Sequence, residues 1–165
     1  RALGDVARVG AYPDAVGRAV VRQLVDHELA HLAIGARWPL PDGAGYPERL
    51  DHVAFDEGLA HYLGLRGHVA LDPRGPAYGA RRARALDRLA TAHRATDAVA
   101  QREHLQREAV ADDFWDKYAS VAGMLACAEA EAHAGVAGLL DLVGPGPDGF
   151  GVRLLGPRAA DVRAG

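Results

Sequence analysis

Residues 27–31 are the segment of this sequence best suited to chemistry. They read His-Glu-Leu-Ala-His and match the pattern H-E-x-x-H. Residues four apart lie on one face of a helix, so His27 and His31 could bind one metal ion from adjacent turns. Glu28 would then lie beside the ion, where it could accept a proton from a metal-bound water. Chance matches are expected on the order of 0.02 times in such a chain. The alternative is a pair of core histidines with an incidental glutamate.

The surrounding residues predict the helix that this pattern requires. Over residues 14–35 the apolar residues recur at helical spacing, after a Pro and an Asp that are typical of a helix start. The two histidines and Glu28 fall within the apolar arc that Val20, Val21 and Leu24 form on this helix. Ionisable groups on a buried face are costly unless they are satisfied, and a metal ion would satisfy them.

One more metal ligand is needed, because a catalytic zinc ion usually takes three protein ligands and a water. The segment Asp-Glu-Gly-Leu-Ala-His-Tyr begins at Asp56, on a second expected helix over residues 48–66, and Glu57 lies 26 positions after His31. His61, four residues after Glu57, is either a partner of that ligand or a ligand in its place. Asp56 is either a brace for the second ring nitrogen of a metal-bound histidine or an ordinary surface carboxylate. The remaining histidines show no pattern of partners and are expected to be solvated or to pack: His52, His68, His93, His104 and His133.

Together the two segments resemble the gluzincin metallopeptidases, the peptidase-MA-like group that includes zinc aminopeptidases. In that group a second helix supplies the third zinc ligand as the Glu of a pattern E-G-x-A-x-Y, which begins here at Glu57. The resemblance covers residues 15–66. It implies that His27, His31 and Glu57 bind Zn²⁺ and that Glu28 is the general base.

A weaker similarity to the same group lies at residues 114–123, where the group has a Tyr that polarises the substrate carbonyl and stabilises the oxyanion. The matching residue is Tyr118, and the alternative is that Tyr118 packs in the core with Trp115 and Val121. The chain also departs from the group. A Pro- and Gly-rich loop at 37–47 lengthens the spacing, and both the G-x-M-E-N segment that recognises a free amino terminus and most of the β-sheet are absent. Aminopeptidase specificity is therefore not implied.

The composition indicates one domain and excludes several classes of partner. The chain has 165 residues, of which 49% are apolar, and a formal net charge of −3. No basic field exists to bind nucleic acid or an anionic membrane, and no apolar run approaches the roughly 20 residues that span a bilayer. Cys127 is the only cysteine, so neither an intrachain disulfide nor a thiolate zinc cluster can form. The start of the chain has neither a Met nor a signal-peptide core and reads as trimmed. The lone cysteine suits the cytoplasm, while secretion stays open.

The other elements are expected to be mainly helical. Residues 78–143 would form a helical C-terminal part, with an Ala- and Arg-rich helix over 78–109, a helix over 113–134 and a short one over 136–143. Strand-like residues are limited to an edge segment at 1–13 and a stretch at 151–155. We therefore expect a mainly α, small zincin-like single domain over the whole chain, with at most a vestigial β-sheet. Four arginines of the expected helix over 78–109 indicate a solvated face, or alternatively a docking surface for an acidic substrate: Arg81, Arg82, Arg84 and Arg88.

These observations lead to an expected function. We expect a zinc-dependent hydrolase, specifically a metallopeptidase that cleaves an amide bond in a peptide or small amide substrate by Glu28-assisted attack of water. Two alternatives stay open. One is a non-proteolytic zinc enzyme that acts on a small molecule in a biosynthetic pathway. The other is a non-catalytic module in which zinc holds helices together, which a fourth ligand at His61 would favour.

Overall fold

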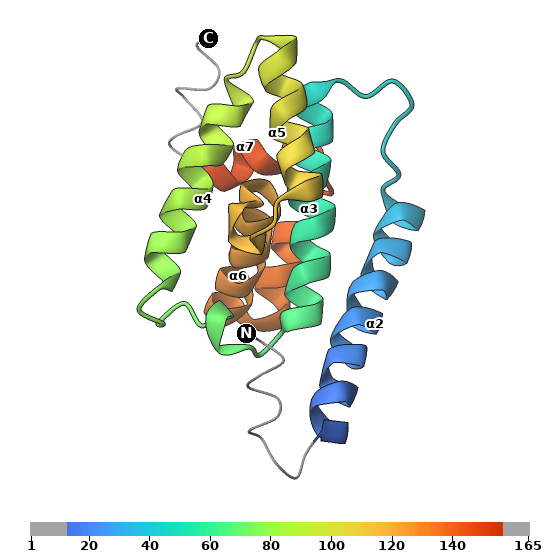
Figure 1. The fold of residues 1–165 in the computed structure, drawn as a ribbon, viewed down its shortest axis with the longest axis vertical. Helices are drawn as coiled ribbons and strands as arrows, with labels where there is room; N and C mark the ends of the chain where they lie inside the picture. Colours follow the sequence, from blue (N-terminus) through green and yellow to red (C-terminus); the bar gives the residue numbers. More distant parts are fainter. Residues whose placement is uncertain (1–12, 157–165) are drawn as a thin grey trace.

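The protein is an array of helices, seen in a computed structural model that describes residues 13–156 (Figure 1). No strand occurs within this range, and the expectation of a mainly α domain is confirmed. None of the helices in this described range has the length and apolar character needed to cross a membrane. The edge strand expected at residues 1–13 falls almost wholly outside the described residues. The helices are α2 (Pro13–Arg37), α3 (Tyr46–Leu65), α4 (Tyr78–His93), α5 (Ala98–Val110), α6 (Tyr118–Val143) and α7 (Phe150–Leu155), with short 3-10 turns η1 (Val69–Leu71) and η2 (Phe114–Asp116).

Two expected elements differ in the structure. The prediction of a single helix over 78–109 is wrong, because α4 ends at His93 and a separate helix, α5, begins at Ala98. Asp97 caps α5 by accepting a hydrogen bond from the backbone N–H of Ala100 at 2.8 Å. The strand expected at 151–155 is also wrong. Gly149, at φ 63°, is the N-cap of the short helix α7, which buries Phe150. A short apolar run does not by itself distinguish a strand from a buried helix.

The centre of the fold is the crossing of α3 and α6, where two glycines let the backbones touch. A Cβ atom on Gly58 would lie 2.7 Å from the Cα of Gly123, and one on Gly123 would collide with the carbonyl oxygen of Ala54. Real Cβ atoms do not approach other atoms so closely, so neither helix tolerates a side chain at this point. The crossing therefore fixes the position of α3, the helix that carries Glu57.

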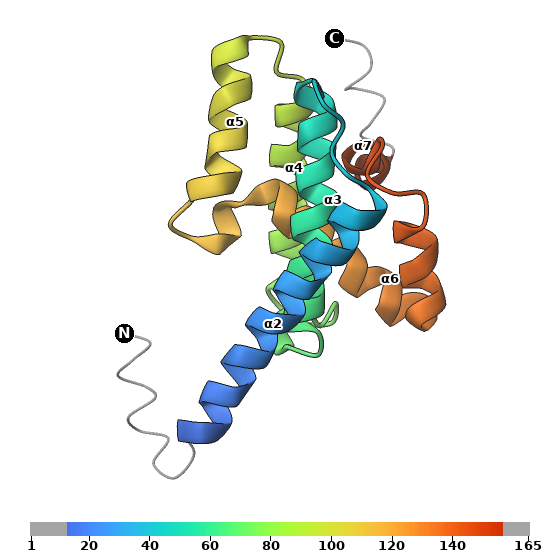
Figure 2. The ribbon, with the colours of Figure 1, turned by 90° about the vertical axis from the view of Figure 1, so that its right-hand side faces the viewer.

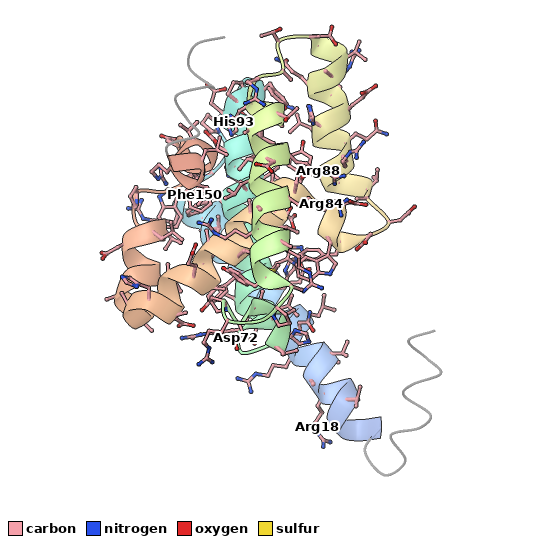
Figure 3. The ribbon with its side chains drawn as sticks, turned by 90° about the vertical axis from the view of Figure 1, so that its left-hand side faces the viewer. Arg18, Asp72, Arg84, Arg88, His93 and Phe150 are labelled. Atoms are coloured by element: carbon pink, nitrogen blue, oxygen red, sulfur yellow. The ribbon has the colours of Figure 1, made fainter. Side chains whose placement is uncertain are left out.

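Helix α2 is attached far less extensively. Its main partner among the described helices is α3, and its N-terminal turns, which carry Arg18, extend beyond the other helices (Figures 2 and 3). Ala30 and Ile34 are buried, but Val20, Val21 and Leu24 are 58%, 60% and 57% exposed. The helix itself is confirmed. The expectation that its apolar arc is buried is wrong, because α3, the main partner of α2, leaves these three side chains in solvent.

The arginines of α4 tie this helix to its neighbours. Arg84 and Arg88 lie on one side of α4 (Figure 3), and each reaches Asp116 Oδ1 at 2.8 Å. Arg82 pairs with Glu129 of α6 at 2.8 Å, and the Arg81 guanidinium lies 4.0 Å from the centre of the Trp115 ring. The face that the sequence indicates as solvated is thus partly occupied by ion pairs and a cation–π contact.

The start of α6 is capped by a side chain from α5. Glu108, 5% exposed, accepts hydrogen bonds from the backbone N–H groups of Ala119 at 3.0 Å and Ser120 at 3.1 Å, and from the Ser120 hydroxyl at 2.9 Å. The two backbone N–H groups belong to the first turn of α6. The N–H groups of the first turn of a helix have no acceptor within their own helix, so Glu108 supplies one. Burial raises the pKa of Glu108, and the hydrogen bonds oppose that rise. Near its other end α6 bends at Gly135, which has φ 63°, close to the predicted boundary between two helices.

Candidate metal centre

The structure brings together the three residues that the sequence predicts as metal ligands. One ligand atom from each of His27, His31 and Glu57 lies within 4.8 Å of the others. The Nε2 atoms of the two histidines are 3.1 Å apart, and His31 Nε2 is 3.9 Å from Glu57 Oε1. Two ligands of a tetrahedral zinc ion, each bonded at about 2.0–2.1 Å, stand about 3.4 Å apart. The donor set of two nitrogens and one carboxylate, and its spacing, therefore fit zinc.

A close approach of α2 and α3 makes this convergence possible. The two histidines lie one helical turn apart on α2, and Glu57 projects from α3. At Gly64 of α3 an added Cβ atom would lie 3.0 Å from the carbonyl oxygen of Gln23 and 3.5 Å from the Cβ of His27. Gly64 thus sets the distance between the two helices beside the centre.

Asp56 holds the His31 ring in the form that a metal requires. Its Oδ1 is 2.9 Å from His31 Nδ1, and because an ionised carboxylate can only accept, this contact favours the tautomer with a proton on Nδ1. Nε2 is then left with a free lone pair toward His27 and Glu57. Of the two roles that the sequence leaves open for Asp56, the geometry agrees with the brace.

His61 lies at the edge of the same cluster. Its Nε2 is 3.4 Å from Glu57 Oε2, and its ring centre is 4.4 Å from that of His27. Phe114 of η2 packs edge-on against the other side of this ring, with 4.5 Å between the centres. His61 is not among the residues whose ligand atoms converge within 4.8 Å. The structure therefore makes His61 a direct neighbour of Glu57, a candidate ligand.

The electrostatics favour the metal-binding forms of two of the candidate ligands. Burial, and then the neighbouring His61 and His31, lower the pKa of His27. Hydrogen bonding with His61 is the largest effect on Glu57 and lowers its pKa, against the opposite effect of burial. His27 is accordingly neutral and Glu57 ionised near neutral pH. Metal binding requires these states, because a ligand must present a free electron pair.

An open pocket of about 340 Å³ adjoins the cluster and includes Glu28. Glu28 is exposed, follows His27 directly on α2, and lies on the wall that faces the pocket. A substrate in this pocket would therefore meet both His27, one of the three candidate ligands, and the Glu28 carboxylate. The residues that line the pocket are Val20, Gln23, Leu24, His27, Glu28, His61 and Gly64.

Tyr118, the predicted oxyanion stabiliser, has another partner in the structure. Its side chain is 2% exposed, and its hydroxyl is hydrogen-bonded to Nδ1 of His104 from α5 at 2.7 Å. Burial raises the pKa of this phenol. Tyr118 does not line the pocket at Glu28. The structure thus places Tyr118 in the core, in agreement with the packing alternative, and its catalytic role stays a prediction.

The pattern E-G-x-A-x-Y contains packing residues as well as a ligand. Gly58 makes the contact with α6, and Tyr62 is buried with its hydroxyl bonded to the Glu131 carboxylate. Sequence reasoning missed Gly64, whose only signal is its place one turn after Ala60 on the same helix. It also missed the buried contact of His93 with Asp51 at 3.2 Å, which links α4 to α3 near α7 (Figure 3).

The residues and their geometry carry the argument about function. Comparison of the chain with protein-family models, with curated proteins and with solved structures finds no match.

Proposed function

We propose that this protein is a zinc-dependent hydrolase, specifically a metallopeptidase of gluzincin type that cleaves an amide bond. The observation that supports the proposal is the convergence of His27, His31 and Glu57 beside a pocket that contains Glu28. The order of the two sequence patterns, H-E-x-x-H and then E-G-x-A-x-Y, agrees with it. A peptide or a small amide is the substrate class that such a centre would take.

The roles of the side chains follow from their positions. When bound, zinc supplies a Lewis acid that polarises a carbonyl group and lowers the pKa of a water molecule. His27, His31 and Glu57 would hold the ion, and Asp56 would keep the His31 ring oriented through Nδ1. Glu28 takes a proton from the attacking water as the C–O bond forms, and delivers it to the leaving nitrogen as the C–N bond breaks.

A second function, a zinc-stapled module without catalysis, draws support from His61. Structural zinc sites are closed by four protein ligands, and the Nε2 atom of His61 lies only 3.4 Å from Glu57 Oε2. The open pocket favours the enzyme, because a structural site needs no access for a substrate. The two functions differ in their dependence on His61 and Glu28.

The experiment compares zinc content, melting temperature and peptide hydrolysis among single substitutions. Glu28→Gln should bind one zinc ion and melt like the parent protein, yet lose about 10²–10⁴-fold in turnover, because only the general base is gone. His31→Ala and Glu57→Gln should lose zinc and the stabilisation that zinc provides. The control is Asp26→Asn, which neutralises a neighbouring carboxylate of α2 that pairs with Arg22.

Two results would contradict the proposal. If Glu28→Gln loses zinc as His31→Ala does, Glu28 belongs to the metal shell. If His61→Ala abolishes zinc binding while no peptide or small amide is hydrolysed by the parent protein, zinc is structural.

A further inference from the structure

The pocket at Glu28 extends along α2, away from His31, and its wall there is aliphatic. Val20 and Leu24 lie eight and four residues before Glu28 on the same face of the helix. At a rise of about 1.5 Å per residue, they stand about 12 Å and 6 Å from Glu28 along the helix axis. The other residues there are Gln23 and Gly64, so Glu28 is the only carboxylate on the pocket wall.

These two aliphatic side chains are exposed, at 58% for Val20 and 57% for Leu24, as are other aliphatic residues of α2, but these two also line the pocket. Exposed apolar surface that adjoins a polar site is typical of ligand binding. The aliphatic surface and the candidate metal centre share one pocket, so a molecule bound at the centre can cover this surface. His27, Glu28 and His61 line the same pocket as Leu24, so a molecule whose amide lies at the metal would place its neighbouring substituent near Leu24.

We infer that Val20 and Leu24 form a binding pocket for an aliphatic side chain next to the cleaved bond, an inference that rests on the proposed function. The pocket takes branched aliphatic groups of the size of a valine or leucine side chain. A substituent with a carboxylate is disfavoured, because it would lie against aliphatic side chains and near the carboxylate of Glu28. Gly64 keeps the opposite wall free of a side chain.

The chain offers a matched control for this inference. Val21 is the same residue type as Val20, follows it directly on α2, and has nearly the same exposure, 60% against 58%. Val21 does not line the pocket. An aspartate at either position therefore has the same intrinsic effect on the helix and on its net charge, but only Val20→Asp and Leu24→Asp place a carboxylate in the pocket.

The test measures the binding of small hydroxamates to the zinc-loaded protein by calorimetry, without any catalytic turnover. Acetohydroxamate reports on the metal alone, and isovalerohydroxamate adds a branched aliphatic group. Succinate monohydroxamate adds a carboxylate, and β-alanine hydroxamate adds a cation. We expect isovalerohydroxamate to bind about 10- to 100-fold more tightly than acetohydroxamate, and the charged probes to gain nothing. Val20→Asp and Leu24→Asp should reduce this preference to within about threefold, and Val21→Asp should retain it.

The outcomes separate this inference from the proposed function. If zinc or acetohydroxamate fails to bind, the proposed function is wrong, and the inference of an aliphatic pocket is then wrong as well. If acetohydroxamate binds but the branched probe binds no better, or if Val21→Asp matches Val20→Asp, the pocket alone is wrong. Tightest binding of the β-alanine probe would also overturn it and would indicate a pocket for cationic side chains. Unchanged acetohydroxamate affinity and helical circular dichroism in the variants confirm that the centre and α2 are intact.

Discussion

Two regions of this protein hold their helices in opposite ways. At the crossing of α3 and α6 the backbones touch through Gly58 and Gly123, and the surrounding residues are fully buried. Helix α2 rests mainly on α3 and leaves several large aliphatic side chains in solvent. The candidate metal centre joins the two regions, because two of its candidate ligands come from α2 and one from α3. The rigid crossing fixes Glu57, whereas the loosely attached helix carries His27, His31 and Glu28.

The difference indicates what a bound metal ion would do for the fold. Regions with few buried contacts open locally at a lower free energy than the core does. An ion held by both helices closes that opening, so metal binding and the docking of α2 are thermodynamically linked. The comparison can therefore be tested by disturbing each region separately.

The largest effect is expected from Gly123→Ala. The added methyl group would collide with the backbone of α3 at Ala54, and the two helices would have to separate. Overpacking commonly costs 1–3 kcal/mol, and a collision with backbone should reach about 3 kcal/mol or more in the free energy of unfolding. Denaturant titration would measure it. Gly35→Ala on α2, where nothing lies within 4 Å of an added Cβ, should instead stabilise by up to about 1 kcal/mol. Equal effects at both glycines would contradict the comparison.

Zinc removal should affect the α2 region more than the crossing. Zinc at a hundredfold excess over its Kd should add about 2.7 kcal/mol to the free energy of unfolding, and a chelator should remove that gain. Hydrogen exchange would locate the effect. We expect protection to increase most at the amides of α2 and least at those of α6 near Gly123. A uniform increase would show that α2 does not open independently of the core.

Asp56→Asn should weaken the centre without breaking the fold. An asparagine can still face His31 Nδ1, but it removes the charge that favours the Nδ1–H form of the ring. Loss of such a partner typically reduces metal affinity by about 10- to 100-fold. Competition with a fluorescent zinc chelator would measure the Kd, and Asp26→Asn should leave it unchanged. An unchanged Kd in Asp56→Asn would show that the contact does not orient the ligand.

The local features of the centre could be predicted from the sequence. The i, i+4 relation of His27 and His31 needs only a helix, and the helix follows from residues near them in the chain. Glu57 came from a second local pattern with its own helix. The fold class followed in the same way, because helical periodicity is visible in one stretch at a time.

The features that depend on distant residues could not be predicted. Whether Val20 and Leu24 are buried depends on what packs against α2, and the sequence pattern alone suggests that they are. The pairing of Gly58 with Gly123 joins residues on helices far apart in the chain, so neither glycine signals the other. The break after His93 has a different cause, because its signal is local: the short side chain of Asp97 caps α5 and competes with helix continuation, and the prediction of one helix overlooked it.

The smallest effect concerns the cap at Glu108, in the firmly packed half of the molecule. Glu108→Ala leaves three donors of the α6 start without an acceptor, and a lost cap typically costs about 0.5–2 kcal/mol. Glu108→Gln keeps one acceptor oxygen and should lose less.

Burial raises the pKa of Glu108 above its ordinary value of 4.5, so the folded protein holds the proton of this carboxyl group more tightly than the unfolded chain does. The stability that the proton provides is complete below about pH 4.5 and is lost as the pH rises through the folded pKa. The free energy of unfolding of the parent protein, relative to Glu108→Gln, should therefore fall across that interval. Urea titrations at a series of pH values would measure the difference, with the exposed Glu103→Gln on the same helix as the control for net charge. A difference that rises with pH instead would mean that the hydrogen bonds to Ala119 and Ser120 outweigh burial.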